Sequence, residues 1–194
     1  MPRKFILATS NPNKIIEIKD AISSDFTIIS LEEAGILEPI PEPHNTIGEN
    51  AVAKAAYVYE KTNMCCVAED TGLEVEALNG EPGVKSARYA GEQRNTTDNI
   101  NKLLANLNNN PNRAARFYTV ISLCHEGKLF TFEGECKGFI TREQRGQGGF
   151  GYDTIFKPLG SNKTFAEMPL AEKQTFSHRK KALDKLTGFI NAVL

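Results

Sequence analysis

Two adjacent carboxylates, Glu69 and Asp70, follow a short apolar run that is rich in β-forming residues. The pattern predicts a buried strand that delivers both side chains to its C-terminal edge, where Thr71 and Gly72 turn the chain away. In open α/β sheets, ligands bind beyond the carboxyl ends of the strands. Two carboxylates there are costly unless cations or a metal ion pair with them. The segment therefore indicates either a metal-dependent phosphate site or a solvated acidic turn.

A second polar segment, TSNPNK at positions 9–14, lies between an apolar strand over residues 4–8 and a helical pattern. Pro12 suits the first helical position, with Asn11 or Ser10 as the N-cap. A helix start that carries a hydroxyl, an amide and a lysine suits a bound anion. The glycines of a Walker A loop are missing, and an ordinary capped strand–helix junction explains the segment equally well.

A helix is predicted from Thr46, whose spacing to Glu49 is that of a capping box, to about Lys61. Asn50 and Lys54 are four residues apart and share one face of this helix. Glu49 has two interpretations, because the capping box alone accounts for it and a metal ligand at the mouth of a cleft does so too. Residues 35–45 hold three prolines and predict an extended, mobile connection.

A glycine-rich segment with aromatic residues covers residues 145–153. Its glycines allow the backbone to approach a ligand closely, and Phe150 or Tyr152 could stack on a nucleobase. The backbone amides and Asp153 could then read the polar edge of that base. The alternative is a flexible glycine turn before a strand over residues 154–156.

The last predicted helix starts with Ser177 as N-cap, followed by His178, Arg179 and two lysines. Basic residues in a first turn oppose the helix dipole, so this departure from the local rule indicates an anion to bind. A short helix with Pro169 near its start precedes it. The predicted core face of the last helix is Ala182, Leu186, Phe189, Ile190 and Val193.

The remaining elements complete an α/β pattern. A strand is predicted over residues 27–31, a helix over 95–107, and a long antiparallel hairpin over 116–124 and 128–140. Antiparallel strands after strand–helix–strand units indicate a mixed sheet. The hairpin could make dimer contacts or leave one face exposed to solvent.

Composition limits the class of protein. The chain has 194 residues, 40% hydrophobic content and a net charge of −1, which suits one α/β domain with room for two lobes and offers no basic field for a nucleic acid polymer. Its four cysteines lack zinc-site spacing and predict reduced, mostly buried thiols in a cytoplasmic protein. Neither a signal peptide nor a membrane span is predicted.

Six motifs occur in the order seen in the inosine triphosphate pyrophosphatase family, which this chain resembles from end to end. They are TSNPNK, GENAVAKA, AEDTGLEV, GEPGVKSARYAG, GGFGYD and AEKQTFSHR. The resemblance implies one ITPase-like domain over residues 1–194, with a mixed twisted central sheet, flanking helices and two lobes around a nucleotide cleft. It also implies a Mg²⁺-dependent homodimer that cleaves ITP, dITP and XTP to the monophosphate and pyrophosphate.

Site roles follow from the resemblance position by position. Asp70 resembles the proton acceptor and a Mg²⁺ ligand, Glu49 a second metal ligand, and Glu69 their support. The residues that resemble the family's contacts to the triphosphate are Thr9, Ser10, Asn11, Pro12, Asn13, Lys14, Lys54 and Thr71. The resemblance also implies a catalytic role for Lys54. The residues that resemble the family's contacts to the nucleotide and its base are Phe150, Gly151, Tyr152, Asp153, Lys173, His178 and Arg179.

Two departures from the common bacterial pattern stand out. Glu69-Asp70-Thr71 replaces a frequent Asp-Asp-Ser, which leaves open how far Glu69 reaches the metal, and Thr154 replaces a frequent proline. Two other functions remain open: a nucleotide-binding sensor without turnover, and a related pyrophosphatase for modified pyrimidine nucleotides. Intact Asp70 and Glu49 argue against the sensor, and the GGFGYD and SHR motifs argue against the pyrimidine enzyme.

Overall fold

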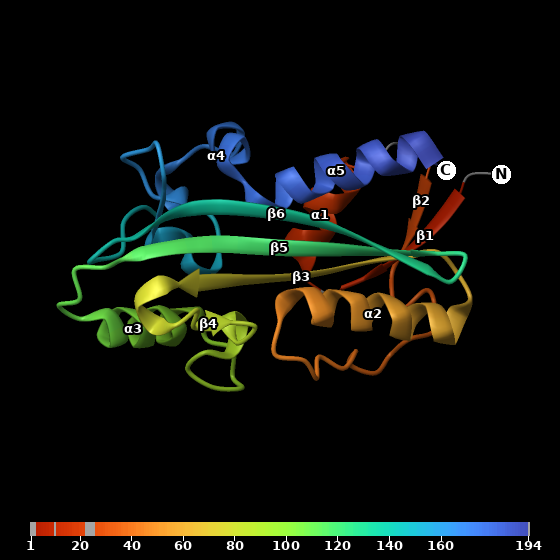
Figure 1. The fold of residues 1–194 in the computed structure, drawn as a ribbon, viewed down its shortest axis with the longest axis horizontal. Helices are drawn as coiled ribbons and strands as arrows, with labels where there is room; N and C mark the ends of the chain where they lie inside the picture. Colours follow the sequence, from red (N-terminus) through yellow and green to blue (C-terminus); the bar gives the residue numbers. More distant parts are fainter. Residues whose placement is uncertain (1–2, 10, 22–25, 194) are drawn as a thin grey trace. The chain divides into compact units, whose positions relative to one another are not determined.

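A computed structural model describes residues 3–9, 11–21 and 26–193, with only the backbone of Arg3, Asn13, Asp20 and Ala21. Within them the helices are α1 (Pro12–Ala21), α2 (Ile47–Thr62), α3 (Thr96–Leu107), α4 (Leu170–Phe176) and α5 (His178–Val193) (Figure 1). The strands are β1 (Arg3–Ala8), β2 (Phe26–Ile29), β3 (Cys66–Val75), β4 (Pro82–Gly83), β5 (Ala114–His125), β6 (Lys128–Ile140) and β7 (Phe156–Pro158).

The strands form a mixed sheet in the order β2-β1-β3-β5-β6-β7, with β4 beside β3. β1 pairs in parallel with β2 and with β3, whereas β3 with β4 and β6 with β7 are antiparallel. The predicted mixed α/β sheet is thus confirmed. No helix in the described part of the chain has the length and apolar character that a bilayer crossing requires.

The chain forms two compact units. Unit 1 comprises Met1–Asp70, Thr119–Gly134 and Arg179–Leu194, and unit 2 comprises Thr71–Tyr118 and Glu135–His178. The strands β3, β5 and β6 each contribute residues to both units.

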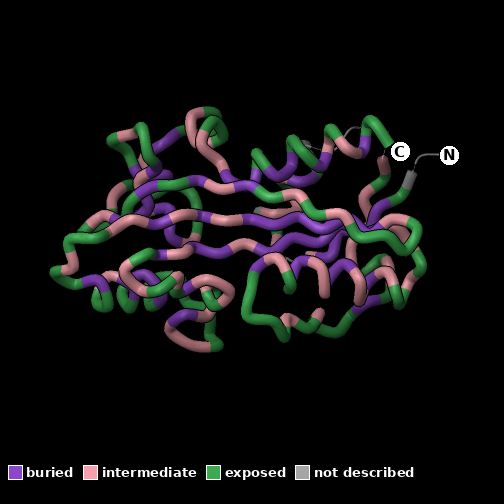
Figure 2. The backbone as a smooth tube through the Cα atoms, in the orientation of Figure 1, coloured by how far each residue is buried: buried purple, intermediate pink, exposed green. Residues whose placement is uncertain are grey.

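Unit 1 has helices on both faces of its part of the sheet. Alternate strand residues point to opposite faces. Phe5 and Leu7 therefore pack with α1 and α5, while Ile6 and Ala8 pack with α2 (Figure 1). Double coverage explains why every residue of β5 from Thr119 to Cys124 is buried, as Figure 2 illustrates.

Unit 2 covers one face of its strand segments with a single core. Between Ala114 and Tyr118, β5 alternates between half-buried and buried residues. The buried Ala115 and Phe117 join the core that contains Leu103 of α3 and Phe165. One strand thus changes from alternating to continuous burial where it passes from unit 2 to unit 1.

Several predicted boundaries differ from the observed ones. β3 does not end at Asp70 but continues to Val75, so the predicted turn at Thr71 and Gly72 is wrong. The strand predicted over residues 154–156 starts later: Thr154 ends a 3-10 turn, η3 (Gly151–Thr154), and β7 begins only at Phe156. On α5, Val193 is 59% exposed, and Leu183 takes a place in the core instead.

Other local predictions are confirmed. Thr46 caps α2, and its hydroxyl accepts a hydrogen bond from the Glu49 amide. Pro12 begins α1, and β6 has the predicted bounds. All four cysteines are free thiols, with only Cys65 less than fully buried.

Candidate active site

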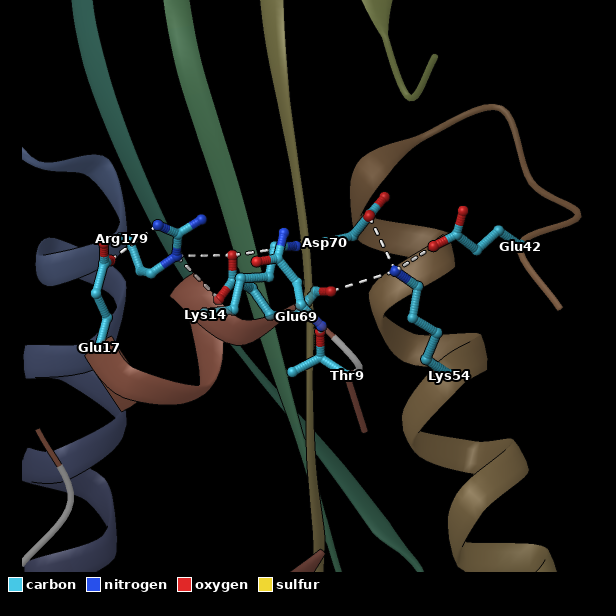
Figure 3. Close-up of polar contacts among 9 residues, drawn as sticks. Thr9, Lys14, Glu17, Glu42, Lys54, Glu69, Asp70 and Arg179 are labelled. Atoms are coloured by element: carbon cyan, nitrogen blue, oxygen red, sulfur yellow. Dashed lines mark hydrogen bonds and ion pairs between the residues drawn. The ribbon is translucent and has the colours of Figure 1, made fainter. Parts of the chain in front are cut away.

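Strand geometry separates the two adjacent carboxylates. Because β3 continues through Glu69 and Asp70, their side chains leave the strand on opposite sides. Figure 3 shows the Glu69 carboxylate turned toward Arg179 and Lys14, and the Asp70 carboxylate turned toward Lys54. The two side chains therefore belong to different ionic clusters rather than to one acidic platform.

The first cluster joins Asp70, Lys54 and Glu42. The Lys54 ammonium lies 3.0 Å from Asp70 Oδ1 and 2.6 Å from Glu42 Oε1, and it donates to the Glu69 carbonyl at 3.2 Å. These three acceptors match the three N–H donors of an ammonium. Lys54 on α2 therefore holds two carboxylates, Asp70 from β3 and Glu42 from the segment that precedes α2 (Figure 3).

Burial sets the charge balance of this cluster. The side chains of Lys54 and Asp70 are only 8% and 12% exposed. Burial raises the pKa of Asp70, although Lys54 and Lys14 pull it down. Burial also opposes the charge of Lys54, but Asp70 and Glu42 outweigh it and raise the Lys54 pKa. An aspartate with a raised pKa beside a fixed cation is a suitable proton acceptor.

The second cluster centres on the buried pair of Glu69 and Arg179. Arg179 Nε lies 2.9 and 3.1 Å from the two Glu69 oxygens, and Nη1 lies 2.8 Å from Glu17 Oε2. Lys14 approaches Glu69 at 3.4 Å. Burial opposes the charge of Arg179, but Glu69 and Glu17 outweigh it and raise the Arg179 pKa. Through Glu69 and Glu17, Arg179 links α5 to β3 and to α1. Glu69 also holds Lys14 close to Arg179, near the start of α1 (Figure 3).

The start of α1 provides the predicted polar loop. Thr9 Oγ1 accepts a hydrogen bond from the Asn11 amide at 3.2 Å, and Lys14 lies in the first turn of the helix. Ser10 lies outside the described residues, and for Asn13 only the backbone is described. The exposed Pro12 occupies the first helical position, where its missing N–H costs nothing.

Glu49 is engaged at the N-terminus of α2. Its carboxylate accepts a hydrogen bond from the Thr46 hydroxyl at 2.7 Å. It also lines a pocket of about 390 Å³ with other α2 residues and with β5 and β6. The Thr46 cap and its hydroxyl contact with Glu49 account for this geometry, and a metal-binding role for Glu49 stays a prediction.

Unit 2 contains a second candidate group, formed by Phe150, Asp153 and Lys173. The Lys173 ammonium lies 2.5 Å from Asp153 Oδ2 and 5.0 Å from the centre of the Phe150 ring. Asp153 is 4% exposed and also accepts the Phe150 amide at 2.9 Å. Phe150, 37% exposed, therefore offers a stacking surface beside the buried Asp153 and the Lys173 ammonium.

The other predicted nucleotide contacts are engaged in packing. Tyr152 is buried, and its hydroxyl donates to the Ser86 carbonyl at 2.8 Å, while Gly151 supplies a positive φ of 60°. His178 stacks on Phe117 with ring centres 4.8 Å apart. Thr71 follows Asp70 on β3. Nucleotide contacts by these residues remain predictions.

Two residues of the clusters were missed by the sequence analysis. Glu17 lies three residues after Lys14 on α1, so helical spacing could have placed it near the same ligands. Glu42 lies in the proline-rich segment, where no periodicity shows which way a side chain points.

Within the described residues, no set of three or more histidine, cysteine, aspartate or glutamate side chains forms a metal cage.

In unit 1, two carboxylates share one lysine and further cations lie near a helix start, features that suit phosphate chemistry; the aromatic and ionic group of unit 2 is a separate candidate. The profile of the Ham1 family matches residues 5–189, and the chain belongs to this family.

Relatives and solved structures agree with this assignment. The chain is 53% identical over 189 residues to a dITP/XTP pyrophosphatase of Flavobacterium johnsoniae, covering 97% of this chain and 98% of the relative. It is similar to the Ham1 protein of Staphylococcus aureus, with a TM-score of 0.93 and 37% identity over 98% of this chain and 99% of that one. A dITP/XTP pyrophosphatase structure from Mycobacterium abscessus has a TM-score of 0.83 and 40% identity, covering 94% of this chain and 98% of that one.

Proposed function

We propose that this chain hydrolyses noncanonical purine nucleoside triphosphates, namely ITP, dITP and XTP, to the monophosphate and pyrophosphate. Removing these nucleotides keeps deaminated purines out of DNA and RNA. The relatives named dITP/XTP pyrophosphatase, matched over nearly their whole length, support the reaction class.

The observation that carries the proposal is the placement of Asp70. Its carboxylate is nearly buried, has a raised pKa and lies 3.0 Å from the Lys54 ammonium. Asp70 accepts the proton of the attacking water, and Lys54 keeps the carboxylate oriented while adding positive charge for the phosphates. Lys14 and the start of α1 bind further phosphate oxygens.

The carboxylates beside Lys54 suit a divalent cation. Mg²⁺ is usually held by one or two carboxylates together with substrate phosphates and water. Asp70 and Glu42 share one ammonium and so offer that donor set, whereas both oxygens of Glu69 already face Arg179. We therefore assign Asp70 and Glu42 as the residues that would hold Mg²⁺, which when bound neutralises charge on the phosphate chain.

Base selection rests on the unit 2 group. Lys173 carries N–H donors, which suit the 6-oxo group of hypoxanthine and xanthine, whereas adenine presents an amine there. The Lys173 side chain is 15% exposed, and leaving a donor unpaired at such a largely enclosed position costs about 1–3 kcal/mol, or roughly one to two decades of discrimination. Phe150 supplies the stacking surface, and Asp153 holds Lys173 in place.

A nucleotide panel with products identified by mass tests the proposal. With Mg²⁺, ITP should yield IMP and pyrophosphate, and ATP should be cleaved far more slowly. Release of IDP and phosphate would refute the assigned bond. Tight binding of ITP without any product over hours would favour a nucleotide sensor, and preference for modified pyrimidine nucleotides would refute the base assignment.

A cytoplasmic homodimer completes the proposal, as the family resemblance implies. Light scattering on the purified chain should give twice the monomer mass at micromolar concentration. A monomer mass with full activity would refute an obligate dimer.

A further inference from the structure

Residues 38–44, which we term the strap, run alongside α2 and contact one of its faces. Glu38 accepts a hydrogen bond from the Tyr57 hydroxyl and forms an ion pair with Lys61. Glu42 forms an ion pair with Lys54, and the His44 amide donates to Asn50. The α2 partners are Asn50, Lys54, Tyr57 and Lys61, whose spacing of four, three and four residues places them on one helix face. The strap therefore runs antiparallel to the helix.

The anchors of the strap differ in strength. The Glu38–Lys61 pair is 45% exposed at both side chains, so water screens it. Asn50 is 1% exposed, and its amide engages both backbone groups of His44. Asn50 Oδ1 accepts from the His44 amide at 2.9 Å, and Asn50 Nδ2 donates to the His44 carbonyl at 3.1 Å. This two-point contact fixes the backbone of His44 as a neighbouring strand would.

The chain between His44 and Glu42 is stiff. Pro41 and Pro43 flank Glu42, and each proline ring fixes its own φ angle. A residue before proline is also confined to extended conformations, which applies to Glu42. The position of His44 is therefore transmitted to Glu42 with little freedom between them.

We propose that Asn50 is a positioning residue for the divalent cation site: by clamping His44 it holds Glu42 against Lys54 and beside Asp70. The inference rests on the proposed function in taking Asp70 and Glu42 as the cation ligands. Asn50 contributes no ligand atom itself, so its loss should weaken the site without removing the proton acceptor.

The chain contains a matched control in unit 2. Asn99 lies four residues after the N-cap of α3, as Asn50 lies four residues after the N-cap of α2. Asn99 Oδ1 accepts from the Ala90 amide at 2.6 Å, and Asn99 Nδ2 donates to the Ala87 carbonyl at 3.0 Å. It is 4% exposed. Asn99→Ala thus removes the same pair of hydrogen bonds from a loop without carboxylate ligands.

The test measures Mn²⁺ binding from the free-ion electron paramagnetic resonance signal, without nucleotide, in wild type and in the Asn50→Ala, Asn99→Ala and Glu42→Gln variants. Partners that orient metal ligands are typically worth 10- to 100-fold in affinity. We expect Asn50→Ala to raise the Mn²⁺ dissociation constant about tenfold, toward that of Glu42→Gln, and Asn99→Ala to leave it unchanged. Thermal unfolding should show comparable destabilisation of both asparagine variants.

A second variant guards against a misfolded Asn50→Ala. Pro41→Gly combined with Pro43→Gly replaces exposed residues and loosens the strap while Asn50 stays intact. It should also weaken Mn²⁺ binding. With ITP at saturation, both strap variants should need about tenfold more Mg²⁺ for half-maximal rate, yet recover kcat to within about threefold at high Mg²⁺.

Equal Mn²⁺ affinity in Asn50→Ala and Asn99→Ala would overturn the inference, as would wild-type affinity in Glu42→Gln or no Mn²⁺ binding by wild type. A loss of kcat with unchanged metal dependence would do so too. Failure of the proposed function is distinct: wild type would bind Mn²⁺ with the expected variant pattern but would not convert ITP to IMP and pyrophosphate.

Discussion

We expect turnover to depend most on Asp70, the proposed proton acceptor. Replacing it with asparagine keeps the shape and the contact with Lys54 but removes the proton acceptor. We expect Asp70→Asn to lower kcat for ITP by about 10²-fold or more, within the usual range for a general base. Circular dichroism should show an intact fold.

Asp184→Asn is a matched control, since Asp184 forms an exposed pair with Lys180. Its kcat should equal that of wild type. If Asp70→Asn also retained full activity, another group would have to accept the proton.

At the scale of single residues, sequence reasoning singled out Asp70 and Lys54 as candidates but did not predict that they pair with each other. The motif brought the two carboxylates together because they are neighbours in the chain. Strand alternation sends them to opposite sides once β3 is known to continue to Val75. The Glu42 side chain could not be placed from the sequence, because where it points depends on the path of a loop. That path depends on the hydrogen bond that the His44 amide donates to Asn50, six residues further along the chain.

Among the elements, the glycine turn before η3 positions Asp153. Gly149 has a φ of 73°, and a Cβ there would collide with the Asp153 carboxylate. We expect Gly149→Ala to displace Asp153 from Lys173 and to raise KM for ITP at least about tenfold, the value of one hydrogen bond to a charged group. Steady-state kinetics measures this effect.

Gly80→Ala separates the collision from backbone strain. Gly80 has a φ of 89°, but nothing lies within 4 Å of a Cβ at that position. Its variant should lose some stability and keep its KM. Similar KM values for the two alanine variants would show that Asp153 does not depend on Gly149.

The strap gives α2 a pH-dependent contact. Hydrogen bonds from Lys61, from the backbone of Glu38 and from Tyr57 lower the pKa of Glu38 from 4.5 to about 2. A lowered carboxyl pKa stabilises the fold above pH 4.5, and this contribution disappears as the pH falls toward 2. Glu38→Gln should therefore be less stable than wild type at pH 6 and equal to it near pH 2.

Urea unfolding at several pH values would measure the difference, which should shrink in high salt because the pair is exposed. A stability difference that persisted unchanged to pH 2 would mean that packing, not the Glu38 charge, is responsible.

Helix starts were the most predictable elements, since caps are local. Thr46 and Pro12 occupy the positions that their residue types favour. The extent of β3 was less predictable, because its pairing with β4 overrides the turn tendency of Thr71 and Gly72. Val193 followed the helical period yet lies beyond the reach of the core.

For the molecule as a whole, each unit has a core of its own, but β3, β5 and β6 continue from one into the other. Melting either unit would release strand residues that continue into the other. We therefore expect a single unfolding transition. Leu103→Ala in unit 2 and Leu186→Ala in unit 1, both fully buried, should each destabilise it by about 2–5 kcal/mol.

Urea titrations followed by fluorescence and by circular dichroism should coincide for both variants. Leu170→Ala, at a position 66% exposed, should change little. Two separated transitions, one for each substitution, would show that the units unfold independently.

Unit 1 draws its last segment from Arg179 onward, and this segment supplies the guanidinium that neutralises the buried Glu69. During translation, a nascent chain that stops before this arginine leaves two acidic side chains, Glu69 and Glu17, without their shared counterion. We therefore expect unit 1 to complete its folding only once the final helix is available, so chains truncated before Arg179 should be degraded rather than partly active.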